Sequence, residues 1–470
     1  MTEWVPKIGA GQRNPSQAIV HALAGDIVSG ALRPGQRLPT HRQLAFNLGV
    51  AIATVTKAYA EARARGYVRS VVGNGTFVIE PPLSERRRIR PHEAASDQLA
   101  HTRIDLSFNA PVTTLGQAAA LTDALRHLGE DERTIGLLDY KRPWAGSERC
   151  RQAGAAWLRS IGLPADPEDI TMTCGAQHAA SVALLSSLRA GDVVLADELT
   201  DPQSKLQANT LGLDLRSVPA DESGMRPDAL EAACCGRRAR GLLCMPDHHS
   251  PTLTVMPEGR RRALAEIARR YELLIFENAV YRPLLGESPP PLTVFAPERS
   301  FFFSSFSKII CPGLRIGFLA APPARRRDLI LGLCATSWMS SPLIAEIATT
   351  WIESGTAARL AHAQRLELHA RNQIAARHLG RFSPIALPSG MHLWLGLPAA
   401  WRADAFVRDA SARGVSVLPS DAFAVGHVSV PHKVRVSIGG STDTHAQLEE
   451  GLAILAGLLL AHGDTAYIPS

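Results

Sequence analysis

The chain has 470 residues, of which 46% are hydrophobic and 20% charged, and a chain of this length is too long for a single core. No apolar run approaches the roughly 20 residues that cross a bilayer, and the first residues lack the pattern of a secretion signal. Seven cysteines without paired spacing fit a reducing compartment. These features argue against a membrane protein and a disulfide-built secreted domain, and we expect a cytoplasmic protein of two or three domains.

Charge is distributed unevenly along the chain. Residues 1–90 contain 13 Lys and Arg against 5 Asp and Glu, a net charge of +8, whereas the overall net charge is +6 and the remainder therefore carries −2. A basic segment joined to a nearly neutral remainder is typical of a nucleic-acid-binding part attached to a second module. We therefore expect the first part of the chain to contact nucleic acid.

Three helices and a hairpin are predicted near the start. Apolar residues recur at helical spacing in 16–30, a Thr and a Gly bound a second helix over 41–48, and a third helix is expected from about 51 to 65. Two β-rich runs then flank Gly73-Asn74-Gly75, which is a strong hairpin signal. This order makes a winged helix-turn-helix, which we expect over residues 1–80.

Residues 81–102 are rich in Pro, Ser and charged residues and predict a linker. The linker contains the run Arg86-Arg87-Arg88. That run fits either a solvated linker or a contact with DNA phosphates, and the sequence leaves both open.

Short β runs alternate with helical segments after the linker. They lie at 192–197, 241–246, 273–278 and 300–305. Such alternation predicts an α/β fold with a largely parallel sheet covered by helices on both faces. Ligands of such folds bind at the carboxyl ends of the strands.

The pattern changes near residue 342. One long helix is expected over about 344–380, followed by short strands and a further helix, as in a smaller α+β domain that closes over the larger one. We therefore predict a large domain over 103–341 and a small domain over 342–470.

The first module resembles the GntR family of regulators. The resemblance rests on G-A-L-R-P-G-Q-R-L-P-T-H-R-Q-L-A-F-N-L-G-V, T-V-T-K-A-Y, G-Y-V and G-N-G-T-F-V. It implies that the third helix enters the major groove of double-stranded DNA and that the wing touches the adjacent groove. The candidate DNA-binding residues are Arg42, Thr54, Thr56, Lys57 and Asn74.

The third helix carries the expected base contacts. The hydroxyls of Thr54 and Thr56, with Lys57, are expected to form one exposed polar face, while Arg42 helps to anchor the DNA backbone. The family usually has Ser-Arg where this chain has Ala51-Ile52, so one common DNA contact is missing. The bases that are recognised are therefore left open.

Lys308 is the candidate catalytic residue. It follows an aromatic β run, which would place its amine at a strand end inside a cleft, where burial lowers the pKa and makes the amine nucleophilic. Ser305, Ser307 and Arg315 surround it with donors that suit a phosphate dianion. This is the setting that a Schiff-base lysine needs.

A second anion-binding segment lies upstream. Gly175, Ala176 and Gln177 are predicted at the start of a helix after a strand, where free N–H groups and the helix dipole attract phosphate. Either segment alone fits a strand end followed by a capped helix. Together with Lys308, the two segments indicate one phosphorylated ligand.

With these residues the second module resembles fold-type I aminotransferases, and the order of modules resembles the MocR subfamily of GntR regulators. Further matches are D-Y-x-x-x-x-A-G-S-E-R, P-x-x-x-x-P-T, E-N-A-V-Y and H-L-W-L. The resemblance implies pyridoxal 5'-phosphate as cofactor, joined to Lys308 as a Schiff base, with Tyr281 bonded to its ring hydroxyl. It also implies a head-to-tail homodimer in which Tyr140 reaches the partner's phosphate site, and a carboxylate held by Arg435.

Three ring contacts depart from the aminotransferase pattern. Asn278 stands where an Asp keeps the pyridine nitrogen protonated, and a neutral amide favours a poor electron sink. Ser250 replaces an Asn, and Asp201 stands where an aromatic side chain usually stacks, unless Asp201 is an unrelated loop residue. The pocket therefore looks better suited to sensing an amino compound than to turnover.

Three functions remain open from the sequence. The first is a DNA-binding regulator whose aminotransferase-like domain binds pyridoxal phosphate and an amino compound as effector. The second is an active aminotransferase carrying a DNA-binding domain, and the third is a regulator whose pocket has lost the cofactor. The pair His248-His249 has no acidic or thiol partner at ligand spacing, so we assign it to the loop near the cofactor and predict no metal site.

Overall fold

The structure is a computed structural model in which two compact units, Met1–Arg90 and Pro91–Ser470, are described separately. The predicted linker, with Arg86-Arg87-Arg88, and the wing residue Asn74 lie outside the described residues. The structure describes residues 4–6, 15–28, 32, 35–64, 67–71, 75–78, 103–140, 143–235, 238–426, 428–440, 442 and 444–461.

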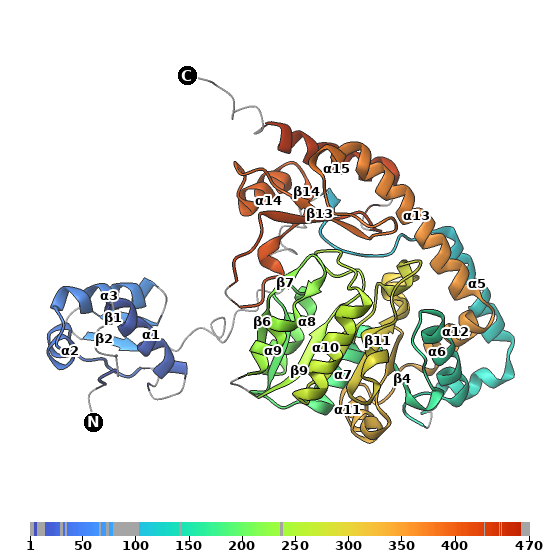
Figure 1. The fold of residues 1–470 in the computed structure, drawn as a ribbon, viewed down its shortest axis with the longest axis horizontal. Helices are drawn as coiled ribbons and strands as arrows, with labels where there is room; N and C mark the ends of the chain where they lie inside the picture. The colour runs from blue at the N-terminus through green and yellow to red at the C-terminus, as the bar shows by residue number, and fades with distance from the viewer. Residues whose placement is uncertain are drawn as a thin grey trace. The chain divides into compact units, whose positions relative to one another are not determined.

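The N-terminal unit is a winged helix-turn-helix, as the sequence predicts (Figure 1). Its core is formed by apolar side chains from all three helices and both strands, among them Ile19, Leu44, Val55 and Val68. The two strands pair antiparallel. The elements are α1 (Pro15–Val28), α2 (His41–Leu48), α3 (Ile52–Ala64), β1 (Val68–Val71) and β2 (Gly75–Val78).

Local signals set both ends of α2. The Thr40 hydroxyl accepts a hydrogen bond from the backbone N–H of Gln43, and the Gln43 side chain accepts one from the backbone N–H of Thr40, both at 3.3 Å. This capping box satisfies donors that the first turn of a helix leaves free. Gly49 ends the helix with φ of 65°, a left-handed conformation that glycine adopts without strain.

A seven-stranded sheet organises the second unit. The strands follow the order β4-β12-β11-β10-β9-β5-β6, and β12 is antiparallel to both its neighbours while the other pairs are parallel. This confirms the predicted α/β fold with a largely parallel sheet. The strands are β4 (Ile170–Thr173), β5 (Val193–Asp197), β6 (Asp214–Val218), β9 (Ala239–Cys244), β10 (Leu274–Asn278), β11 (Ser300–Ser305) and β12 (Gly317–Ala320), and a separate hairpin pairs β7 (Ala220–Asp221) with β8 (Gly224–Met225).

Both faces of this sheet are buried. In β5, β9 and β10, successive apolar residues enter different hydrophobic clusters, because side chains alternate between the two faces: Val194 packs in one cluster and Leu195 in the other. Helices α9 and α10 contribute to the cluster of Leu195, and α5, α6, α7, α8 and α11 to that of Val194. The helices that precede residue 342 are α5 (Leu115–Glu130), α6 (Glu148–Ser160), α7 (Ala176–Ser187), α8 (Pro202–Thr210), α9 (Pro227–Cys234), α10 (Glu258–Arg270) and α11 (Arg326–Thr336).

The prediction of one long helix over 344–380 is wrong in one respect. The segment forms two helices, α12 (Pro342–Glu353) and α13 (Thr356–Leu379), because Gly355 between them has φ of 73° and interrupts the helix. The helical periodicity of the sequence continues across this break, so the pattern of apolar residues did not reveal it.

A smaller α+β layer follows. Strands β13 (His392–Gly396), β15 (Leu418–Pro419) and β16 (Lys433–Ser437) form a sheet in the order β13-β16-β15, with α14 (Ala403–Ala412) and α15 (His445–Ala461). Strand β3 (Ile104–Asp105) pairs with β14 (Val415–Ser416), and Ile104 lies in the hydrophobic cluster of this layer. The first described residues after the predicted linker thus pack against the C-terminal layer, although the sequence assigned them to the large domain.

Candidate functional site

A cavity of about 200 Å³ lies where the parallel strands end. Its wall comes from segments that are far apart in the sequence, including the turns after β10 and β11, the starts of α7 and α8, and strand β16. Convergence at the carboxyl ends of strands is the usual place for a ligand in an α/β fold. The predicted residues that line it are Ala176, Gln177, Asp201, Ser250, Asn278, Tyr281, Ser305, Ser307, Lys308, Arg315 and Arg435.

Lys308 lies in the short 3-10 helix η6 (Phe306–Lys308), directly after β11. Its amine donates a hydrogen bond to the backbone carbonyl of Asn109 at 2.5 Å and lies 4.6 Å from the ring centroid of Phe108. Burial lowers the pKa of Lys308 to about 8, with repulsion from Arg435 acting in the same direction and Asp201 opposing it. A substantial fraction of the amine is therefore neutral, and nucleophilic, near neutral pH.

Hydrogen-bond donors converge beside this amine. The guanidinium of Arg315 donates to Ser307 Oγ and to the carbonyl of Cys174, both at 3.3 Å. Gly175, the N-cap of α7, has φ of 88°, and a Cβ atom there would meet Arg315 Nη2 at 3.0 Å. Glycine thus lets the guanidinium approach the start of α7, whose free N–H groups favour an anion.

The hydroxyl group of Tyr281 is held by Asn109, which the sequence did not single out, and Asn109 is held by His392, which the sequence marked only as the first residue of the H-L-W-L match. His392 is buried, which lowers its pKa well below the usual range, so the ring is neutral and has one donor and one acceptor nitrogen. Its Nε2 lies 3.1 Å from the carbonyl of Pro251, which can only accept, so Nδ1 accepts from Asn109 Nδ2 at 2.9 Å. The second proton of that amide is donated to Tyr281 Oη at 3.0 Å.

This chain of contacts leaves two groups available to a ligand. The hydroxyl proton of Tyr281 is not needed for the bond from Asn109, and Asn109 Oδ1 has no partner within the described part of the chain. A buried acceptor without a partner is costly unless a bound group satisfies it. Asn109 lines the cavity, and no local motif marks it, because its partners lie 172 and 283 residues away.

The three departures from the aminotransferase pattern line the cavity wall. Asn278 Oδ1 accepts from the backbone N–H of Val280 at 3.3 Å. Asp201 is the N-cap of α8 and accepts from the N–H groups of Gln203 and Ser204. Ser250 Oγ accepts from Arg435 at 3.2 Å. Asp201 therefore has a local role in α8 besides placing a carboxylate in the cavity.

Arg435 is buried beside the cavity on β16. Besides Ser250, its guanidinium donates to the carbonyl of Ser107 at 2.6 Å and lies 5.0 Å from the ring centroid of Phe423. Two of its nitrogens are thus engaged, and Nε has no partner within the described residues. Tyr140 lies outside the cavity wall: its side chain is 69% exposed and its ring is 6.2 Å from that of Trp338.

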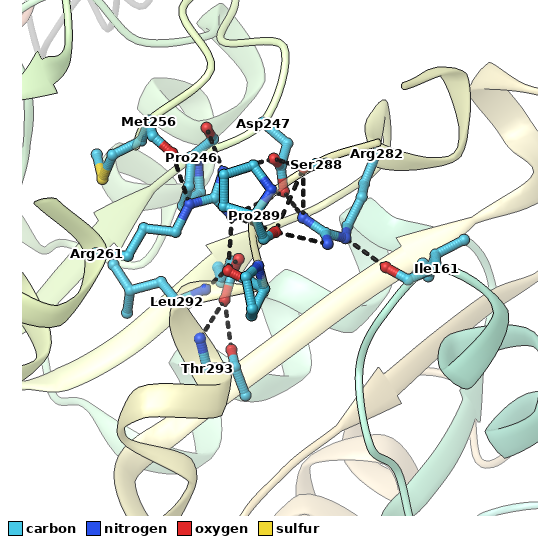
Figure 2. A network of polar contacts seen from close by, with 12 residues as sticks. Ile161, Pro246, Asp247, Met256, Arg261, Arg282, Ser288, Pro289, Leu292 and Thr293 are labelled. Atoms are coloured by element: carbon cyan, nitrogen blue, oxygen red, sulfur yellow. Dashed lines mark hydrogen bonds and ion pairs between the residues drawn. The ribbon is translucent and has the colours of Figure 1, made fainter. Parts of the chain in front are cut away.

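A buried ionic network supports the loops that carry these residues (Figure 2). Asp247 is fully buried and pairs with Arg261 at 2.7 Å and with Arg282. Burial raises the pKa of Asp247, but the two guanidinium groups outweigh it, so that the carboxyl stays ionised with a lowered pKa. Arg282 follows Tyr281 directly, and Asp247 lies three residues before Ser250, so the network fixes two parts of the cavity wall.

The histidine pair lies behind this wall. The ring of His248 stacks on that of Tyr281 with centroids 4.8 Å apart, while His249 Nε2 lies 3.6 Å from Asp197. Burial lowers the pKa of both histidines to about 4, so both are neutral. In the described residues, no three His, Cys, Asp or Glu side chains come together as metal ligands.

In the N-terminal unit, Arg42, Thr56 and Lys57 are exposed. Thr54 is half-buried; it points nearly away from Thr56, two residues on, but lies on the same side of the helix as Lys57, three residues on. Thr54 thus lies at the edge of the exposed side that carries Thr56 and Lys57, and its contact with DNA stays a prediction. The Thr56 hydroxyl donates to the carbonyl of Ile52 at 3.0 Å, within its own helix.

Both units match known families. Residues 103–454 match the family described as aminotransferase class I and II, and residues 15–78 match the bacterial regulatory proteins of the gntR family. Among solved structures, the multiple substrate aminotransferase of Thermococcus profundus is 22% identical with a TM-score of 0.72, over 82% of this chain and 98% of that one. At this identity the likeness establishes the fold alone.

Transcriptional regulators match this chain over most of its length, and one of them over nearly all of it. The chain is 30% identical over 458 residues to the uncharacterized HTH-type transcriptional regulator YdeF of Bacillus subtilis, covering 97% of this chain and 96% of YdeF. It is also 30% identical over 310 residues to the HTH-type pyridoxine biosynthesis transcriptional regulator PdxR of Corynebacterium glutamicum, covering 64% and 65%.

The chain therefore belongs to the HTH-type transcriptional regulators in which a GntR domain precedes an aminotransferase class I and II domain, the MocR architecture. It is a DNA-binding regulator, as the sequence predicts. Among its described helices, none is both long and apolar enough for a transmembrane segment.

Proposed function

We propose that this regulator binds pyridoxal 5'-phosphate in the cavity and responds there to a small amino compound. The observation that carries the proposal is the meeting, in one cavity, of the Lys308 amine with an anion-binding group of side chains and helix N–H groups. Lys308 would hold the cofactor covalently. Ser305, Ser307, Arg315 and the N–H groups of Gly175, Ala176 and Gln177 would hold its phosphate.

The residues present fit this cofactor in most respects. Bound pyridoxal phosphate supplies an aldehyde carbon that reacts with amines. Tyr281 can donate to its ring hydroxyl, because Asn109 already supplies the proton that Tyr281 Oη accepts. Asn278 would face the ring nitrogen with a neutral amide, which supports sensing of an amine rather than turnover. Arg435 would attract the carboxylate of an amino-acid effector.

Residues 104–110 provide a route from the cavity to the linker. The carbonyl of Asn109 accepts from Lys308, and the carbonyl of Ser107 accepts from Arg435. A ligand that binds Lys308 or Arg435 would replace the hydrogen bond of that side chain to residues 107–109. These residues belong to the segment that follows the linker directly in the sequence. In a head-to-tail homodimer, with Tyr140 reaching the partner's phosphate site, such a change would alter the spacing of two winged helices on DNA in the cytoplasm.

The cofactor proposal is tested by absorbance. The full chain, incubated with pyridoxal phosphate and freed of excess, is expected to gain a visible absorption band. Lys308→Ala is expected to lose the band, whereas Lys433→Ala, which removes an amine on β16 outside the cavity wall, keeps it. Absence of the band from the intact chain would overturn cofactor binding.

DNA binding through α3 is tested by salt dependence. Lys57→Ala is expected to weaken binding to operator DNA and to reduce the slope of log affinity against log salt by about 0.9, the value for one lost phosphate contact. Lys433→Ala again serves as the control and should leave the slope unchanged. An unchanged slope in Lys57→Ala would remove Lys57 from the DNA contact.

A further inference from the structure

The DNA-facing side of α3 begins with apolar residues. Val55, Ala58, Tyr59 and Ala62 are buried in the core of the unit. The opposite side of the helix is exposed, and it consists of Ile52, Ala53, Thr56, Lys57, Ala60 and Arg63. Ile52 is 50% exposed at the first position of the helix, directly after exposed Ala51. Within the first turn the polar side chain is Thr54, which is half-buried, and the fully exposed polar side chains Thr56 and Lys57 follow it.

Hydrogen bonding by this turn is further reduced by contacts within the unit. The Thr56 hydroxyl donates its proton to the Ile52 carbonyl and lies 3.1 Å from His41 Nδ1. The proton of Thr56 is therefore not available to a base edge. The first residues of a recognition helix are those that reach base edges in the major groove. In this chain that position presents an aliphatic group.

The chemistry of the major groove decides what an aliphatic side chain can recognise. Guanine, adenine and cytosine edges present donors and acceptors, whereas thymine also presents a C5-methyl group. Covering a donor or acceptor with Ile52 removes it from water without replacing its hydrogen bond, which is unfavourable. Contact with the thymine methyl buries apolar surface on both sides and is favourable.

We propose that Ile52 recognises the C5-methyl group of a thymine in each half-site of the operator. The inference rests on the DNA-binding function and specifies one feature of its target, an A·T pair facing the first turn of α3. The basic side chains on the same side of the helix, Lys57 and Arg63, support DNA as the occupant, because an apolar protein partner would leave these charges uncompensated.

The test replaces thymine by uracil, which lacks only this methyl group. Duplexes that the full-length protein binds are selected from a randomised pool, and the selected duplex is then made with deoxyuridine at one thymine position at a time. At one position per half-site, affinity is expected to fall about four-fold, the factor for one methyl-sized group removed from an apolar contact. At that position, Ile52→Ala should bind the two duplexes equally.

A matched control separates this contact from general loss of apolar surface. Phe46 on α2 is 87% exposed and lies outside the exposed side of α3, so Phe46→Ala should still distinguish thymine from uracil. Ile52 is not part of the core, so Ile52→Ala should unfold at the same temperature as the parent chain.

The possible failures are distinguishable. If no duplex is selected, the DNA-binding function fails, and the proposal fails with it. If duplexes are bound but no thymine position is sensitive to uracil, or if Ile52→Ala keeps the sensitivity, the assignment to Ile52 is overturned and DNA binding stands.

Discussion

The two units of this regulator are specified by the sequence in different ways. In the winged helix-turn-helix, neighbours along the chain set the structure: Thr40 and Gln43 cap α2, and Gly49 ends it. In the cavity, the decisive contacts join distant segments, such as Lys308 to Asn109 over 199 residues. Local signals can be interpreted from spacing, whereas long-range contacts depend on the topology of the whole sheet. The first unit is therefore the more predictable one.

Both units nevertheless depart from their families at the residues that would touch a ligand. The first has Ala51-Ile52 where the resemblance leads one to expect Ser-Arg, and the second has Asn278 where it leads one to expect Asp. The two units nevertheless match the gntR family and the aminotransferase class I and II family, respectively. The fold of each unit is thus kept, while residues expected to touch DNA or the cofactor differ. Substitutions that destabilise the fold can therefore be distinguished from substitutions that change a ligand contact.

The largest expected effect concerns the frame of the cavity. Asp247→Ala leaves Arg261 and Arg282 buried without their carboxylate and should lower the free energy of unfolding by about 3–5 kcal/mol. Urea unfolding followed by tryptophan fluorescence measures this, because all tryptophans except Trp4 lie in the second unit.

The control for Asp247 is an ion pair on the surface. Glu449 pairs with Arg377 at 2.9 Å between α15 and α13, and both side chains are exposed. Glu449→Ala should change the free energy of unfolding by less than about 1 kcal/mol. Equal effects of the two substitutions would mean that the network at Asp247 does not hold the cavity wall.

The next largest effect is expected at Asn278, which would contact the cofactor and is not part of the ionic network around Asp247. Asn278→Asp restores a carboxylate and can keep the bond from the Val280 N–H. With pyridoxal phosphate bound, it should raise the rate of keto-acid formation from an amino acid and 2-oxoglutarate by roughly a hundred-fold, the lower end of what a proton-holding group supplies. Asn278→Ala should bring no gain. A parent chain as active as Asn278→Asp would favour the aminotransferase function instead of sensing.

The errors of the sequence prediction follow the same division. The helices and hairpin of the first unit, the β runs after residue 190 and the lysine after β11 were predicted correctly, since each depends on a local pattern. The break at Gly355 was missed because helical periodicity continues across it. Thr54 is half-buried rather than fully exposed, because it lies next to Lys57 at the edge of the exposed side of α3.

Long-range partners were missed for a different reason. Asn109 carries no motif, and the H-L-W-L match that contains His392 does not state its role; both roles depend on the start of the second unit and β13 meeting at Tyr281. The same holds for the network around Asp247. The sequence marks Asp247 as a charged residue in a loop, and its burial between two arginines depends on tertiary packing.

A smaller effect is expected at a local signal. Thr40→Ala removes the capping box of α2 and should cost about 1 kcal/mol, whereas Thr40→Ser should retain the cap. Hydrogen exchange of a peptide covering α2 measures this within the full chain, and protection should fall about five-fold if that helix opens locally. A loss of protection that extends through the second unit would show that the two units are not independent in this respect.

The smallest expected effect concerns Asp201, which has a local role as the cap of α8 and a long-range role through its charge near Lys308. Asp201 caps α8, and its charge opposes the lowering of the Lys308 pKa to about 8. Asn is an equally good cap but is neutral, so Asp201→Asn should keep α8 and shift the pKa of Lys308 further down.

The neutral amine is the reactive form, and its fraction rises as pH rises through the pKa. The rate at which cofactor-free protein takes up pyridoxal phosphate should therefore have its midpoint near pH 8 in the parent chain and lower in Asp201→Asn. The control Asp404→Asn, on α14 outside the cavity wall, should leave it unchanged. A midpoint that rises in Asp201→Asn would show that the carboxylate acts on Lys308 through the fold of α8 rather than through its charge.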